Sequence, residues 1–295
     1  MKLVKGIRNE ILILGAMVII CSLIIAGCSE KGTVNSHELS NANQPQNNSM
    51  TLNREIADFE KKYSDPRDFV KLKWINGIPR ERAIRIITKD DMPLLHEMLK
   101  DLDYAPYWHN VANLIGYISD DPCSVPVLLD YFQRNDETMT YVSFPAKIWC
   151  VANIGRIGKQ GANELLHKAI TEEGAIELAQ EWLDSTSLEE EYSREWTIDY
   201  IRLAAMHGLI YTGIKENIEL IENIYEKENA VYKDTGEVTR LLHNSIDALA
   251  ARDYIAENGI SAYMNLASGD ISRFSSAMEP YFSRYAPFLN IKAGK

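Results

Sequence analysis

VANLIGYI at residues 111–118 and VANIGRIG at residues 151–158 resemble each other: their VAN triplets start 40 residues apart and their glycines lie 39 apart, so the match is imperfect. AAMHGL at residues 204–209 and DALAA at residues 247–251 echo them. In each segment the small and apolar residues recur at the spacing of a buried helix face. Segments that return at intervals of this size indicate an architecture built from repeated units.

Each of the four segments is followed by a short polar break and then by a second apolar stripe. The stripes with the clearest helical spacing lie within residues 94–99, 127–132, 165–170 and 218–225. Alternating patterns long enough to predict β-strands are absent. The sequence therefore predicts an all-α fold.

This order of a helix with small residues near its end, a turn and a second helix resembles HEAT-type repeats, including the short HEAT-like form of many bacterial proteins. The resemblance covers residues 66 to 270 and is one of pattern, without a diagnostic string. It implies an α-solenoid of about five helix pairs, in which stacking buries stripes that a single pair cannot bury. Gly116, Gly155 and Gly208 would then let neighbouring helices approach closely.

The pattern is irregular between Gly155 and Gly208, which lie 53 residues apart. This interval leaves room for a further helix over residues 171–185 and a capping box at residues 187–190. Residues 279–288 are aromatic and broken by two prolines, and we expect them to cover the open apolar end of the last pair. At the other end we expect a first cap made of Ile56, Phe59, Phe69, Val70 and Leu72.

The N-terminus has the features of an export signal. Lys2, Lys5 and Arg8 precede an uncharged apolar run at residues 11–25, which is shorter than the ~20 residues of a spanning helix. The run ends in Ile25-Ala26-Gly27-Cys28, which resembles the lipobox of bacterial lipoproteins. The resemblance implies cleavage before Cys28 and a diacylglyceryl group on its sulfur, and two acyl chains suffice for stable anchoring. The alternative is an uncleaved N-terminal anchor.

We therefore expect three parts: a signal peptide at residues 1–27, a lipidated flexible tether at 28–50 and the helical domain at 51–295. The tether is rich in Ser, Asn and Gln, and a coil of this length reaches about 25 Å. The predicted location is extracytoplasmic, at the cell membrane or, in a cell with two membranes, at the outer membrane. The sequence does not decide between these hosts.

The net charge of the chain limits the classes of partner that it can bind. The chain carries a net charge of −11, and removal of residues 1–27 leaves 28 basic against 41 acidic residues. Nucleic acid and anionic lipid are recognised by clusters of Lys and Arg, so an acidic chain is a poor candidate for either. We expect membrane contact through the lipid anchor alone.

Sites for metals, cofactors or covalent catalysis are not apparent. The histidines have no HExxH spacing, so no metal and no cofactor is predicted, and His207 is expected to be a core-edge histidine bonded to a backbone carbonyl. GxSxG, SxxK and Gly-rich phosphate motifs are absent, so catalytic residues stay unknown. Cys123 and Cys150 could form a disulfide in an exported protein, although two buried thiols are favoured.

The function that fits best is binding. We expect the second helix of each pair to present a surface to a protein or peptide of the cell envelope, through polar positions off the apolar stripes: Glu97, Asp130, Gln133, Lys168, Glu219 and Glu222. Two alternatives stay open. One is a helical-toroid lyase or hydrolase acting on cell-wall or polysaccharide substrates, and the other is an accessory lipoprotein beside a transporter or a secreted toxin.

Overall fold

The computed structural model describes residues 48–74, 78–135, 143–183 and 193–286, and all regular secondary structure within these ranges is helical. The all-α prediction is confirmed. The predicted signal peptide, the lipobox-like tetrapeptide with Cys28, residues 28–47 of the predicted tether and the predicted capping box at residues 187–190 lie outside the described residues. Within them, no helix combines the length and the apolar character needed to cross a membrane.

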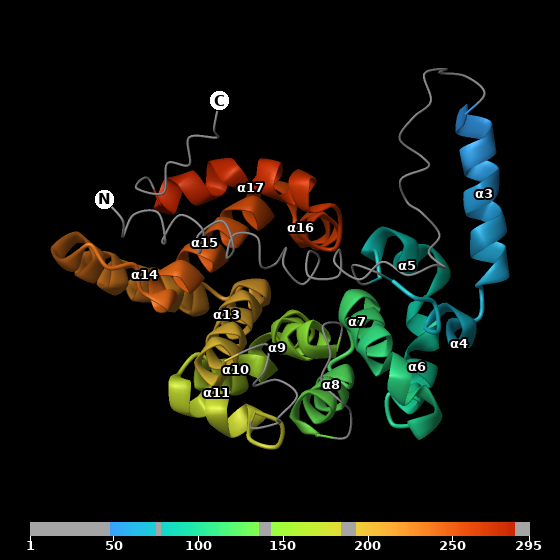
Figure 1. Ribbon diagram of the computed structural model, residues 1–295, viewed down its shortest axis with the longest axis horizontal. Helices are drawn as coiled ribbons and strands as arrows, with labels where there is room; N and C mark the ends of the chain where they lie inside the picture. The colour runs from blue at the N-terminus through green and yellow to red at the C-terminus, as the bar shows by residue number, and fades with distance from the viewer. Residues whose placement is uncertain (1–47, 75–77, 136–142, 184–192, 287–295) are drawn as a thin grey trace.

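Four helices form a row in which each packs against the next: α7 (Trp108–Ile118), α9 (Ser143–Gly158), α13 (Arg194–Thr212) and α15 (Arg240–Asn258). The four related sequence segments lie in these four helices. Figure 1 shows the row following a curved path through the molecule. One apolar core extends along it, because both neighbours of each inner helix cover its apolar surface.

The remaining helices flank the row or close its ends. The flanking helices are α6 (Met92–Met98), α8 (Ser124–Gln133), α10 (Asn163–Ala169), α11 (Glu172–Ala179) and α14 (Lys215–Thr235). The N-terminal end comprises α3 (Asn48–Lys62), α4 (Pro66–Phe69) and α5 (Arg80–Ile86), and the C-terminal end α16 (Ile260–Ala267) and α17 (Ile271–Tyr285). Three 3-10 turns, η3 (Lys89–Asp91), η4 (Leu102–Tyr107) and η5 (Lys159–Ala162), precede α6, α7 and α10. Helix α11 lies within the extra helix predicted for residues 171–185.

Glycines set the closest approach in the row. A Cβ placed on Gly155 of α9 would lie 2.6 Å from Gly208 Cα of α13, and a Cβ on Gly116 of α7 would lie 2.7 Å from Asn153 Cγ of α9. Real Cβ atoms essentially never come within 3.0 Å of another heavy atom. The expectation that these glycines permit close helix packing is confirmed.

Polar side chains also join neighbouring helices, by donating to carbonyls at helix C-termini that have no partner within their own helix. The Lys147 Nζ atom is fully buried and lies 2.7 Å from Tyr131 O, at the end of α8. Lysine and arginine are favoured there because they complement the helix dipole. Four further side chains donate hydrogen bonds to carbonyls at helix ends in the same way: Trp108 to Met98 O, Arg156 to Gly116 O, Trp182 to Phe132 O and Arg202 to Ile170 O.

The first and last helices of the domain differ from the prediction in two respects. Helix α3 begins at Asn48, so residues 48–50, assigned to the tether, are helical. Helix α17 runs without interruption through Pro280, whereas the prolines were expected to break this segment. Proline removes one backbone donor, and Pro280 is exposed, which leaves the neighbouring backbone open to water. Phe69 and Val70 are buried, as expected of a first cap.

Cys123 and Cys150, the two cysteines in the described ranges, are not joined by a disulfide. Cys150 is buried in α9, and its Sγ lies 3.2 Å from Ala146 O. Cys123 is exposed, so the prediction of two buried thiols is wrong for this residue.

The two ends of the domain meet. Arg80, the first residue of α5, donates from Nη1 to Asn265 Oδ1 of α16 at 2.6 Å, and its backbone N–H donates to Ser268 Oγ at 3.3 Å. Helices α5 and α16 are separated by more than 170 residues in sequence and lie side by side (Figure 1). This contact closes the curve formed by the row of helices.

Candidate functional site

The six residues of the predicted binding surface all lie on flanking helices. Glu97 is on α6, Asp130 and Gln133 are on α8, and Lys168 is on α10. Helix α14 carries Glu219 and Glu222. The side chains of Gln133 and Glu222 are half-buried, and the other four are exposed.

Three of these six residues form ion pairs with a nearby residue. Asp130 lies 3.7 Å from Arg134, Lys168 lies 2.5 Å from Glu177, and Glu219 lies 3.1 Å from Lys215. Exposed pairs of this kind contribute about 0.2–1 kcal/mol each, so a binding partner can replace them at little cost. Glu222 differs, because its partner Arg252 belongs to a larger network.

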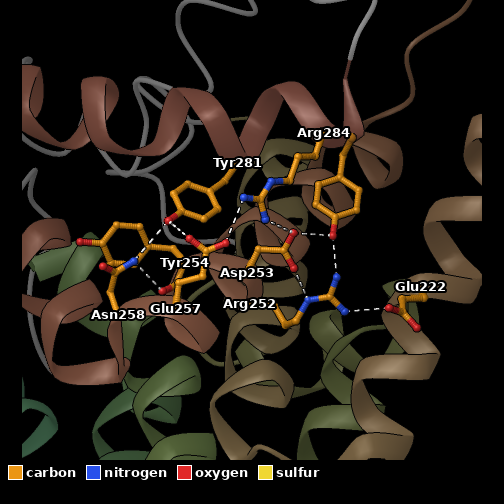
Figure 2. Close-up of polar contacts among 9 residues, drawn as sticks. Glu222, Arg252, Asp253, Tyr254, Glu257, Asn258, Tyr281 and Arg284 are labelled. Carbon is orange, nitrogen blue, oxygen red and sulfur yellow. Dashed lines mark hydrogen bonds and ion pairs between the residues drawn. The ribbon is translucent and has the colours of Figure 1, made fainter.

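Arg252 of α15 is the centre of that network (Figure 2). Its Nη1 lies 2.7 Å from Glu222 Oε1, its Nε lies 2.6 Å from Asp253 Oδ1, and its Nη2 lies 2.5 Å from the Tyr285 hydroxyl. Burial opposes the cation, but the hydrogen bonds to Glu222 and Asp253 outweigh it and raise the pKa of Arg252. All three helices around it, α14, α15 and α17, are thereby joined through one guanidinium group.

Arg284 of α17 extends the network along α15, at 3.1 Å from Asp253 Oδ2 and 3.0 Å from Glu257 Oε1. The Tyr281 hydroxyl donates to Glu257 Oε2 at 2.7 Å, as Figure 2 shows. The hydrogen bond from Tyr281 and those from Arg284 lower the pKa of Glu257.

Every carboxylate of this network already accepts hydrogen bonds from a neighbouring cation or tyrosine. Because these carboxylates already have hydrogen-bond partners, the network is better suited to holding helices together than to binding a ligand. The network therefore serves to hold α17 against α15. Sequence reasoning missed it, except for Glu222, because its members come from three helices and show no local motif.

A second polar cluster lies in the core, where α13, α15 and α16 meet. His207 is fully buried, with Nδ1 3.4 Å from the Tyr211 hydroxyl and Nε2 3.5 Å from Asp247 Oδ2. The Tyr263 ring stacks on the imidazole at a centroid distance of 6.2 Å. We expected His207 to bond to a backbone carbonyl, but the nearest polar neighbours of its imidazole are side chains.

This core cluster brings together a carboxylate, an imidazole and two phenols, which are groups used in acid–base catalysis. Burial raises the pKa of both Tyr211 and Tyr263, so both hydroxyls stay protonated. The His207 Nε2 and Tyr263 hydroxyl atoms are buried without a hydrogen bond. From the sequence, only His207 and Tyr211 could have been predicted to lie close together, because they are four residues apart on one helix.

A small cavity of about 10 Å³ lies between α13 and α15, which is about enough for one water molecule. It is lined by Asp199, Tyr200, Leu203, Arg240, His243 and Asn244. Among the described residues, no group of three or more His, Cys, Asp or Glu side chains is arranged to hold a metal ion. Comparison of the chain with family models, curated proteins and solved structures finds no match.

Proposed function

We propose that this chain is an extracytoplasmic lipoprotein, anchored through lipid on Cys28, whose helical domain is a scaffold that binds a protein or peptide of the cell envelope. The lipobox-like tetrapeptide at residues 25–28 and the polar stretch after it support the anchor and the tether. We further propose that the domain is a HEAT-like α-solenoid of about five helix pairs. The row of α7, α9, α13 and α15 with a flanking helix beside each supports this.

The observation that carries the binding proposal is the placement of Glu97, Asp130, Lys168 and Glu219. These exposed polar residues lie on four of the five flanking helices, α6, α8, α10 and α14. The close packing at Gly155 and the hydrogen bonds that join neighbouring helices hold these flanking helices in fixed relation. A surface that is already ordered loses little entropy on binding, which favours recognition.

The partner should carry basic or mixed charge. Three of the four exposed positions are acidic, and residues 88–286 as a whole hold 33 acidic against 16 basic residues. Electrostatic complementarity of this kind speeds association and disfavours acidic competitors.

The enzyme alternative is supported by one observation, the convergence of Asp247, His207 and Tyr211. A proton relay from carboxylate to imidazole to phenol could act on a glycan. Full burial of His207 and the raised pKa of Tyr211 fit a structural cluster better, because the phenol is held in its protonated form. Turnover of cell-wall fragments that is lost in Tyr211→Phe would favour the enzyme.

The test is crosslinking in cells followed by purification of the lipidated protein. A triple variant with Glu97→Lys, Asp130→Lys and Glu219→Lys should lose the specific envelope protein that the wild type captures. The control variant reverses three exposed acids away from this surface: Asp58→Lys, Glu237→Lys and Glu279→Lys. Both variants change the net charge equally, so loss in both, or in neither, would contradict the assignment of the surface.

The anchor is tested separately on the same strain. The mature wild-type protein should begin at Cys28 and carry the mass of a diacylglyceryl group, and Cys28→Ser should lose this mass and retain residues 1–27. A wild-type protein that retains residues 1–27 and carries no lipid would support the uncleaved anchor instead.

A further inference from the structure

The charges of the domain are unevenly distributed along the chain. Residues 48–87, which include α3, α4 and α5, hold nine basic and six acidic residues, whereas residues 88–286 hold 16 basic and 33 acidic residues. The first part, called the basic end below, thus has a net charge of +3 in a domain that is otherwise strongly negative. At physiological salt the Debye length is about 8 Å, so a surface close to the basic end feels its charge and little of the rest.

Most of the cations at the basic end are not neutralised by a neighbour. Arg67 and Arg85 pair with Asp65 and Glu60 at 3.6 and 3.5 Å. Six other basic side chains form no ion pair within the described part of the chain: Arg54, Lys61, Lys62, Lys71, Lys73 and Arg82. All six are exposed. In the acidic remainder, by contrast, five of the eight arginines and three lysines have a carboxylate partner.

Aromatic and apolar groups accompany these cations. Lys62, Lys71 and Arg82 lie 5.0, 5.4 and 5.5 Å from the centroids of the Tyr63, Tyr104 and Phe59 rings. Ile84, between Arg82 and Arg85 on α5, is 44% exposed and adds an apolar side chain to these cations. Basic residues mixed with apolar and aromatic ones are typical of surfaces that rest on anionic lipid.

The basic end is also the part of the domain nearest to the anchor along the chain. Only residues 29–47 separate Cys28 from the first residue of α3. A coil of this length spans about 25 Å, so α3 to α5 stay close to any surface that holds the lipid. Figure 1 shows α3, α4 and α5 together at one end of the molecule, with α14 at the opposite end.

We propose that the basic end docks on an anionic phospholipid surface, so that the acidic remainder of the domain points away from the membrane. This inference rests on the proposed lipid anchor and replaces the expectation, drawn from the charge of the whole chain, that lipid on Cys28 is the only membrane contact. Docking would orient the domain, because the acidic part is repelled by the surface that attracts α3 to α5. The exposed acids of α14, such as Glu219, then face partners arriving from the aqueous side.

The test measures cosedimentation of residues 28–295 carrying Cys28→Ser, which retain every described helix but cannot be lipidated. The vesicles are phosphatidylcholine with phosphatidylglycerol, and phosphatidylcholine alone. The docking variant carries Lys61→Gln, Lys62→Gln, Lys71→Gln and Lys73→Gln. The control removes the same number of positive charges from exposed positions on α14 and α17: Lys215→Gln, Lys227→Gln, Lys233→Gln and Arg273→Gln.

We expect binding to the anionic vesicles, none to the neutral ones, and weaker binding above about 0.1 M salt. Each basic residue near an anionic surface strengthens binding about five-fold, so the docking variant should lose at least about ten-fold and the control less than about two-fold. Absence of binding by the parent chain, or equal loss in both variants, would overturn the proposal. Lipid attachment is measured by mass on the full chain in cells, so a failure of docking and a failure of the anchor give different results.

Discussion

Gly155→Ala tests whether the row of helices depends on backbone contact between α9 and α13. The new Cβ would lie 2.6 Å from Gly208 Cα, whereas ordinary van der Waals contact begins at 3.4 Å. The obstacle is the backbone of α13, so no change of rotamer can relieve the overlap. The two helices would have to separate by roughly 1 Å, in an interior as densely packed as an organic crystal.

The expected cost follows from two opposing effects. Overpacking a well-filled core costs about 1–3 kcal/mol, and the upper value applies because backbone must move. Alanine recovers about 1 kcal/mol through its higher helix propensity. The net loss of about 2 kcal/mol should lower Tm by about 4–8 °C in a domain of this size.

Thermal unfolding followed by circular dichroism measures this shift. The matched control is Gly161→Ala in η5, where an added Cβ meets nothing within 4 Å. Its Tm should stay within about 2 °C of the parent, as for most surface substitutions. If Gly155→Ala left Tm unchanged or raised it, the argument from close packing would be wrong.

Three further predictions concern buried and networked charges. Lys147→Met removes the donor to Tyr131 O and should cost about 3 kcal/mol in urea unfolding, and a cost below about 1 kcal/mol would contradict the capping role. Burial lowers the pKa of His109 to about 4 from 6.5, so the neutral ring is favoured in the folded state. Stability should therefore be complete above pH 6.5 and fall by about 3 kcal/mol towards pH 4, and His109→Gln should remove that part of the fall in acid titrations. Arg252→Gln should cost about 2–3 kcal/mol by thermal unfolding and Arg284→Gln clearly less, because the Arg284 side chain is 45% exposed and that of Arg252 only 22%.

Features that depend on local sequence could be predicted. The four related segments became α7, α9, α13 and α15 because their apolar spacing specifies a helix whatever packs against it. Gly155 and Gly208 could be recognised as contact positions since they lie among small residues on helices expected to be neighbours. Local information also explains the error at Pro280, where the absence of one N–H was tolerated because the residue faces solvent.

Features that depend on distant partners could not be predicted. Arg252 is next to Asp253 in sequence, but only the tertiary fold brings Glu222 and Tyr285 to Arg252. The fold likewise brings Arg284 to Asp253 and Glu257. Lys147 stands within an apolar helix, where a sequence pattern gives no sign that its Nζ atom reaches the end of α8. The six residues of the predicted surface stay a prediction, apart from the observation that Glu222 is engaged in the network.

The contact between α5 and α16 bears on what sets the curvature of the domain. Arg80 meets only neutral acceptors there, Asn265 and Ser268, and burial lowers its pKa, so the closure gains no ion-pair attraction to offset desolvation. The hydrogen bond from its guanidinium contributes about 1.5–3 kcal/mol and the one from its backbone N–H about 0.5–1.5 kcal/mol, which is small beside the apolar core that runs through the row. The packing of successive helices must then set the curvature of the row, and Gly155 against Gly208 is the central contact in that packing. The contact at Arg80 is a consequence of this curvature. It follows that the domain keeps its shape, and the spacing of the surface residues, even when the contact at Arg80 is open.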